Sequence, residues 1–311
     1  MKTKKIIIIS VFTALMLLVA LTSCANTTTS TTTTIAASST TTKAVSPLTD
    51  QELQKLLSDA VSASKDFTTY RYDINMVMKM TVDGESAPGN IALKMNGALD
   101  MLKPAIELDM EMTVPDDSGD PQNQKVLMYL IDKTMYIKMN VPGVGEQWIK
   151  TTATEELMKT FDVNMMNEQW DAFASPESIE YVKEESSNGV SCYVLKIIPT
   201  SEYLRKYAEQ NASQGLKIDW DKVKDIMDLY KDMVFQVWIT KDSKQIIKMT
   251  TTSTMIFTDD YAQSSDMSFD KITMDIDMTA ELFDQGKPID LTLPAEAENA
   301  VELAPEALLG N

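Results

Sequence analysis

The sequence predicts an α+β protein built on an antiparallel β-sheet, and three features of its pattern lead to this prediction. Apolar and polar residues alternate with period two in several stretches, most clearly over residues 70–80 and 272–278. Turn residues separate neighbouring stretches, as in a meander. Helical patterns stand before, between and within two runs of such stretches, which is typical of an α+β arrangement.

A secretory signal sequence is expected at residues 1–23, because a basic start is followed by an apolar run from Ile6 to Leu21. The run ends in Leu21-Thr22-Ser23-Cys24, which resembles the bacterial lipobox. That resemblance implies that Cys24 carries a diacylglyceryl thioether, becomes the new N-terminus and anchors the chain to the membrane. The alternatives are a chance cysteine after an ordinary signal peptide and an uncleaved membrane anchor.

Residues 24–47 are expected to form a disordered tether, because Thr and Ser dominate them and little in them can pack. Whether the hydroxyl groups carry glycans is left open by the sequence. The only other cysteine is Cys192, which falls in a predicted strand. We expect a small buried side chain there, not a reactive thiol or a disulfide.

An amphipathic helix is expected after the tether. Thr49 and Glu52 have the spacing of a capping box, and Leu48 and Leu53 that of a hydrophobic staple. An apolar stripe at helical spacing follows, formed by Leu53, Leu56, Leu57, Ala60 and Val61. Such a helix must lie on an apolar surface, and the sheet that follows is the expected partner.

The first run of strands begins with the stretch that alternates most clearly. Tyr70, Tyr72, Ile74, Met76, Met78 and Met80 share one face, and the other face is almost wholly polar. Further strands are expected at 91–101, 106–114, 126–131, 134–141 and 147–150, with Asp132-Lys133 as a tight hairpin turn.

The second run is interrupted by helical patterns. A capping-box spacing at Thr152 and Glu155 predicts a helix that continues to Phe173, and strands 179–182 and 190–198 flank an Asn188-Gly189 turn. Between 201 and 233 we expect helix, with Asp219 as N-cap and a stripe of Trp220, Val223, Ile226, Met227 and Tyr230. Strands are expected at 234–240, 245–257, 267–278 and 288–293, and residues 295–311 are expected to be a weakly ordered, acidic, Ala-rich tail.

Composition excludes several classes of function. The net charge of -18 opposes binding to nucleic acid. The chain has no histidine, which removes the commonest general base and metal ligand, and no nucleotide-binding or nucleophile-elbow motif is present. The acidic loop at residues 116–120 lacks the spacing of an EF-hand and is interpreted as a solvated hairpin loop. We therefore expect no enzyme, no metal and no cofactor.

The order of the predicted elements resembles that of the LolA-like superfamily. The lipobox is followed by a polar spacer, a capped helix, a meander with one polar face, the Trp148 segment, further helices and the second run of strands. More closely, it resembles LppX/LprG-type surface lipoproteins. The resemblance implies an unclosed antiparallel β half-barrel with helices covering its concave face. It implies a single domain over residues 48–294, with halves at about 48–150 and 151–294.

Methionine occurs 22 times and is concentrated in the predicted strands. Its flexible, polarizable side chain suits surfaces that accept variable apolar shapes. The candidate ligand-binding residues are Tyr72, Met76, Met78, Met80, Met95, Met110, Met112, Met274 and Met278. The alternative is a methionine-rich core that packs only against helices.

Two functions follow from these observations. The first is a monomeric lipoprotein, anchored on the extracytoplasmic face of the membrane, that binds or carries a lipid or other long apolar ligand in a methionine-lined cleft. The second is a cell-surface interaction or envelope-sensing module with a filled core and no ligand.

Overall fold

The computed structural model describes residues 48–87, 89–116, 118–141, 145–153, 158, 170, 173–205, 226–258 and 270–303. The first run of strands is β1 (Thr69–Val82), β2 (Glu85–Ser86), β3 (Ile91–Asp100), β4 (Ala105–Pro115), β5 (Pro121–Ile131), β6 (Thr134–Val141) and β7 (Gly145–Thr152). The second run is β8 (Ser178–Ser187), β9 (Val190–Ile198), β10 (Tyr230–Thr240), β11 (Ile246–Thr258), β12 (Lys271–Phe283) and β13 (Val301–Glu302). The helices are α2 (Asp50–Lys65), α6 (Ile226–Leu229) and the 3-10 helix η3 (Ala295–Asn299).

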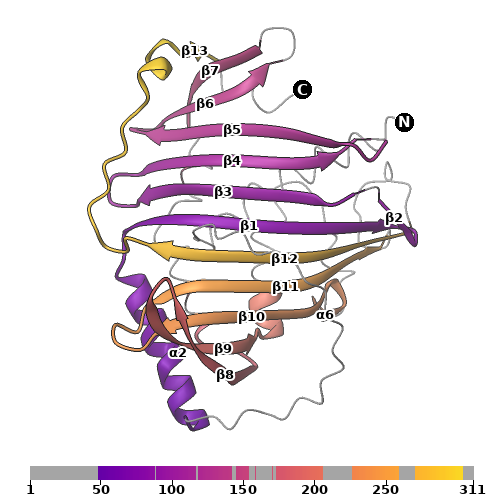
Figure 1. Ribbon diagram of the computed structural model, residues 1–311, viewed down its shortest axis with the longest axis vertical. Coiled ribbons are helices and arrows are strands. Elements are labelled where there is room, and N and C mark those ends of the chain that lie inside the picture. The colour runs from indigo at the N-terminus through magenta and orange to yellow at the C-terminus, as the bar shows by residue number, and fades with distance from the viewer. Residues whose placement is uncertain are drawn as a thin grey trace.

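The described strands belong to one sheet, in the order β13-β7-β6-β5-β4-β3-β1-β12-β11-β10-β9-β8, with β2 paired to β1 (Figure 1). The pairs are antiparallel except β13 with β7. Among the described residues no strand connects β13 to β8, so the sheet is unclosed. The prediction of an open, largely antiparallel sheet is confirmed.

The two faces of the sheet differ as the period-two pattern predicts. On β1, Met76 and Met78 are 3% and 4% exposed, whereas the side chain of Lys79 between Met78 and Met80 is exposed. We call the face that carries Met76 and Met78 the inner face and the opposite one the outer face. Inner-face side chains of all the longer strands from β12 to β5 join one hydrophobic core.

Helix α2 begins as its sequence predicts. The Thr49 hydroxyl accepts a hydrogen bond from the Glu52 amide, and the Glu52 carboxylate accepts from the Thr49 amide, so both halves of the capping box are present. The predicted apolar stripe is buried and joins the hydrophobic core, with α2 lying against β8 and β11. In Figure 1 the helix lies at the lower end of the sheet. Among the described residues, the main contacts of α2 and α6 with the sheet are with β8, β10 and β11, so helices that cover the whole concave face stay a prediction.

The predicted turns are confirmed by their backbone angles. Asp132 and Lys133 have φ of 51° and 66°, and Asn188 and Gly189 have φ of 52° and 79°. Positive φ at both central residues is the pattern of a type I′ hairpin turn. The flanking strands are longer than predicted, since β5 starts at Pro121 and β8 ends at Ser187. The added residues are mostly polar and carry no apolar alternation, so only their pairing with β4 and β9 reveals them.

One predicted helical stripe is partly wrong. Helix α6 ends at Leu229, and Tyr230 and Met233 belong to β10, where Tyr230 lies opposite Met255 of β11. A β-bulge shifts the register between Lys231 and Val234. The bulge interrupts the period-two alternation, which is why the start of the strand resembles a helix in the sequence.

Several expected elements lie partly or wholly outside the described residues. Met158, Trp170 and Phe173 are helical, but most of the helix predicted after Thr152 is not described. The same holds for Asp219, Trp220 and Val223, and for the leader and tether with Cys24.

The C-terminal segment departs from two predictions. Residues 288–293 form no strand; in Figure 1 the segment runs past the strand ends, from β12 to the far edge of the sheet. The tail is not weakly ordered over 295–302, because η3 and β13 form there and Ala297 and Ala300 are buried against Tyr129 and Trp148. These alanines are too small to give a pattern without their distant partners.

Gly97 of β3 tests how closely the strands are packed. A Cβ atom at this position would lie 2.0 Å from the carbonyl oxygen of Glu107 and 3.0 Å from the Tyr72 ring. We expect Gly97→Ala to lower the free energy of unfolding by about 1–3 kcal/mol, because backbone must move. Urea denaturation measures this, with exposed Asn96→Ala as the control. An unchanged midpoint for Gly97→Ala would contradict the packing described.

The capping box predicts a pH dependence. Hydrogen bonds from the Thr49 amide and hydroxyl, both 2.8 Å long, hold the pKa of Glu52 below its ordinary 4.5. A lowered folded-state pKa gives stabilisation that is complete above pH 4.5 and is lost as the pH falls through the folded pKa. Glu52→Gln keeps an acceptor but does not titrate. We expect the difference in unfolding temperature between wild type and this variant to shrink on acidification, as measured by thermal unfolding. A difference that stays constant with pH would contradict this role of Glu52.

Candidate functional site

The candidate site is the inner face over four adjacent strands, which we call the methionine face. It contains the nine predicted ligand-binding residues, and the structure brings all of them together on β1, β3, β4 and β12. They are Tyr72, Met76, Met78 and Met80 of β1, Met95 of β3, Met110 and Met112 of β4, and Met274 and Met278 of β12.

Register places methionines directly opposite one another. Met76 lies opposite Met278 and Met80 opposite Met274, while Met95 lies opposite Met110. Directly opposed side chains have Cβ atoms about 4.5–5.5 Å apart, so these thioethers are neighbours. Sequence alternation alone predicted the face but not this pairing.

The methionine face is almost completely buried. Eight of its nine residues are between 3% and 8% exposed, and Met80 is half-buried against the same core. Burial of this kind fits both a packed core and a surface that receives a ligand. The cleft predicted at this face stays a prediction, because the described residues do not outline one.

Beyond the methionine face, the inner face continues into an aromatic cluster. The ring of Phe173 lies 5.3 Å from that of Phe235 and 6.4 Å from that of Tyr203, measured between centroids. Burial raises the pKa of both Tyr203 and Tyr230, and Tyr203 adds to the effect at Tyr230. Both phenols therefore stay protonated and uncharged at physiological pH.

Three hydroxyl groups on the inner face were not among the candidate residues predicted from the sequence. Thr151 of β7 and Thr251 and Ser253 of β11 are 3%, 3% and 7% exposed, and their hydroxyl oxygens have no hydrogen-bond partner among the described residues. Register puts Thr151 opposite inner-face Met135, and Thr251 opposite Met278. The signal was present in the alternation of β11, but a run of Thr and Ser there also fits ordinary strand propensity.

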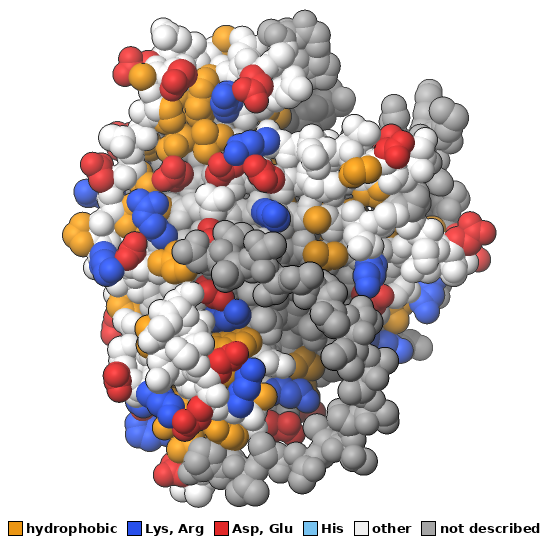
Figure 2. Space-filling model, in the orientation of Figure 1, with side chains coloured by type: hydrophobic (Ala, Val, Ile, Leu, Met, Phe, Trp, Pro, Cys, Tyr) orange, Lys and Arg blue, Asp and Glu red, His pale blue; other side chains and the backbone are white. Residues whose placement is uncertain are grey.

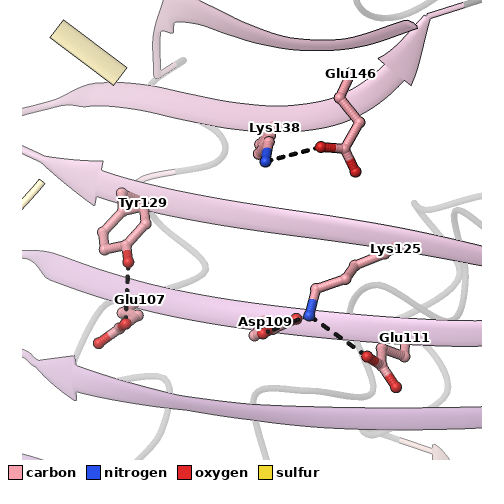
Figure 3. A network of polar contacts seen from close by, with 7 residues as sticks. All are labelled: Glu107, Asp109, Glu111, Lys125, Tyr129, Lys138 and Glu146. Atoms are coloured by element: carbon pink, nitrogen blue, oxygen red, sulfur yellow. Dashed lines mark hydrogen bonds and ion pairs between the residues drawn. The ribbon is translucent and has the colours of Figure 1, made fainter. Parts of the chain in front are cut away.

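The outer face is charged and internally paired. Lys125 Nζ lies 3.0 Å from Asp109 and 3.4 Å from Glu111, and Lys138 lies 2.9 Å from Glu146 (Figure 3). The hydrogen bond to Asp109 is the main reason that the pKa of Lys125 is raised. Figure 2 shows basic and acidic side chains interspersed over the face that it presents. Such exposed pairs add little stability, but they keep a surface hydrated.

Tyr129 shows where the outer face is covered. Its hydroxyl donates to Glu107 Oε1 at 3.0 Å (Figure 3), and its ring packs with Trp148, Ala297 and Ala300. Burial, followed by the charge of Glu107, raises the pKa of Tyr129 to about 12. The C-terminal segment thus forms a small second core on this face.

A hollow of about 320 Å³ lies over β3, β4 and β5. Most of its lining comes from outer-face residues, among them Lys94, Glu111, Thr113, Asn123 and Lys125. Its mixture of paired charges and polar groups differs from the apolar lining expected for a lipid site, so we do not take it as the ligand site.

The acidic loop and Cys192 take structural roles. Asp116 Oδ1 accepts hydrogen bonds from the amides of Ser118 and Asp120, at 2.8 and 3.0 Å, and these lower the pKa of Asp116. Among the described residues no three acidic, His or Cys side chains group as metal ligands. Cys192 is fully buried as a free thiol, and desolvation raises its pKa. That burial agrees with the sequence interpretation of Cys192.

Two further observations concern the membrane. Cys24, the predicted lipidation site, lies outside the described residues. Within the part of the chain that the structure describes, no helix has the length and apolar character needed to cross a bilayer.

Comparison with known proteins gives distant structural similarity. The fold is similar to LprF from Mycobacterium bovis, with a TM-score of 0.42 and 12% identity over 79% of this chain and 98% of LprF. It is similar to the lipoprotein LppX from Mycobacterium tuberculosis, with a TM-score of 0.38 and 11% identity over 78% and 100%. A putative outer membrane lipoprotein-sorting protein domain from Vibrio parahaemolyticus matches with a TM-score of 0.23 and 12% identity over 81% and 97%.

These neighbours include the LppX-type and lipoprotein-sorting folds that the sequence resembles. At TM-scores below 0.5 these similarities assign no function to this chain. No curated protein matches the sequence. The model of DUF6612, a family of unknown function, matches residues 52–302, and the chain therefore belongs to the DUF6612 family.

Proposed function

We propose that this protein is a lipoprotein, anchored on the extracytoplasmic face of the membrane, whose methionine face binds the apolar chain of a lipid. The observation that carries the proposal is the direct cross-strand pairing of methionines, as between Met76 and Met278, on a buried face of four neighbouring strands. The proposal includes no enzymatic activity and no cofactor.

The choice of methionine is the physical basis of the proposal. A core that needs one rigid packing is best filled by Leu, Ile and Val, whose rotamers are better defined. Methionine has three rotatable side-chain bonds and a polarizable sulfur, so a methionine surface can adapt to apolar shapes that vary. A ligand that leaves the bilayer for such a surface exchanges one apolar environment for another at little net cost.

Anchoring would bring the site to its ligand. In the proposal the diacylglyceryl group on Cys24 holds the chain at the membrane, and the Thr/Ser tether lets the folded domain reach a donor or acceptor. The acidic, ion-paired outer face would stay in water, away from anionic headgroups. We propose a monomer that acts alone on its ligand.

A second function is favoured by the depth of burial on the same face. Exposures of 3% to 8% are also those of a filled core, which a cell-surface interaction or envelope-sensing module without a ligand would have. The two functions differ in whether the protein takes up apolar molecules.

Mass spectrometry of organic extracts from natively purified protein separates the two functions. We expect a lipid in stoichiometric amount from the native protein and none after the protein is denatured, washed and refolded. The refolded protein should then take up a fluorescent phospholipid from vesicles. Protein that yields no lipid and takes up no probe would be an interaction module.

Replacing Met76 and Met78 by Leu tests the role of methionine itself. Leucine has similar volume, so the free energy of unfolding should change by less than about 1.5 kcal/mol. For a lipid carrier, the range of acyl-chain lengths bound should narrow, which a series of phosphatidylcholines in a competition assay would measure. Met101→Leu, in the turn after β3, is the control. An unaltered range in the Met76/Met78 variant would argue against an adaptable methionine surface.

A further inference from the structure

The inner face of β11 contains a polar interruption. Met249, Met255 and Phe257 point to the inner face, but between them stand Thr251 and Ser253. Cross-strand partners fix the direction of both side chains, since Thr251 lies opposite Met278 and Ser253 opposite Ile276. A strand that served only to fill an apolar core would be expected to carry apolar residues at these positions.

Both hydroxyl groups are buried. Thr251 is 3% exposed and Ser253 is 7% exposed, and neither hydroxyl oxygen makes a hydrogen bond within the part of the chain that the structure describes. A buried hydroxyl group that lacks a partner destabilises the folded state, and such groups are uncommon in native proteins. Two of them on one face of one strand indicate that a partner arrives from outside the chain.

The surroundings of the two hydroxyl groups limit the charge of such a partner. The β-bulge of β10, between Lys231 and Val234, lies beside Ser253, and bulges are frequent next to binding sites. The cross-strand neighbours of the two hydroxyls are Phe235, Met278 and Ile276, all uncharged. An anionic group would be buried there without a cation, whereas a neutral acceptor would not carry that cost.

We propose that Thr251 and Ser253 donate hydrogen bonds to the ester oxygens of an acyl lipid whose chain lies on the methionine face. This inference rests on the proposed function and deepens it, because it names an ester-linked acyl lipid instead of a hydrocarbon or a free fatty acid. Two residues apart on a strand, the side chains start about 6.6 Å from each other. Each hydroxyl group can therefore donate a hydrogen bond to a different ester oxygen.

The test compares wild type with a Thr251→Val, Ser253→Ala double variant, which removes both hydroxyls at nearly constant volume. Methyl palmitate, octadecane and sodium palmitate are the probes, each measured by displacement of the apolar dye N-phenyl-1-naphthylamine. Wild type should prefer methyl palmitate to octadecane of the same chain length. In the variant this preference should fall about tenfold or more. Sodium palmitate should bind wild type more weakly than the ester.

Two control variants separate the hydroxyl pair from general effects. Thr151→Val removes another buried hydroxyl from the same face, which has no hydrogen-bond partner among the described residues and lies seven strands away on β7, and should leave the preference unchanged. Thr252→Val removes an exposed outer-face hydroxyl between the two positions and should also leave it unchanged. Without ligand, the double variant should unfold at a urea concentration no lower than wild type, because it loses two unsatisfied groups.

The outcomes distinguish this inference from the proposed function. If wild type binds the probes but the double variant keeps the preference for the ester, the inference fails and the lipid-binding function stands. A lowered unfolding midpoint would mean that the hydroxyls had partners in the free protein, and tighter binding of sodium palmitate would refute a neutral ligand; either overturns the inference. If wild type binds neither dye nor probe, the inference and the proposed function both fail.

Discussion

The pairing of β1 with β12 is the interaction on which the rest of the structure depends. It joins strands from opposite ends of the chain over twelve residue pairs, from Arg71 with Phe283 to Val82 with Ile272. Through it the run β1 to β7 and the run β8 to β12 become one sheet. A slip of one residue would turn every apolar side chain of one run to the outer face, so burial of the inner face fixes the register. The methionine face exists because this register is kept.

Local patterns were enough to predict most elements, and distant pairing explains the exceptions. Alternation, the Thr49 capping box and the Asn188-Gly189 turn are local signals, and each appears as expected. The start of β10 was missed because its bulge disturbs the alternation. The ordering of Ala297 and Ala300 depends on Tyr129 and Trp148, far away in sequence, and no local pattern could reveal it. Contacts of this kind are set by topology, which a single sequence does not display.

The candidate site also combines features that the sequence predicts with features that only the structure reveals. Period two predicts which residues share the methionine face, since each strand presents every second side chain to one side. It does not predict which strands are neighbours, so the opposition of Met76 and Met278 became visible only in the sheet. Thr251 and Ser253 were hidden for a different reason. Threonine is a favoured strand residue, and only the lack of a hydrogen-bond partner among the described residues distinguishes these two hydroxyls from ordinary ones.

An unclosed sheet has two edges that could pair with another chain, and both edges here are protected. At one edge, β8 carries Glu180, Lys183 and Glu184 and has a bulge between Tyr181 and Lys183. At the other, β13 pairs with β7 at Ile149 and Lys150, and the C-terminal segment covers Trp148 beside them. Charge, bulge and cover all oppose strand addition. Among the described residues the sheet therefore stays open with both edges protected, and the proposed binding of a long apolar chain to its inner face would require this openness.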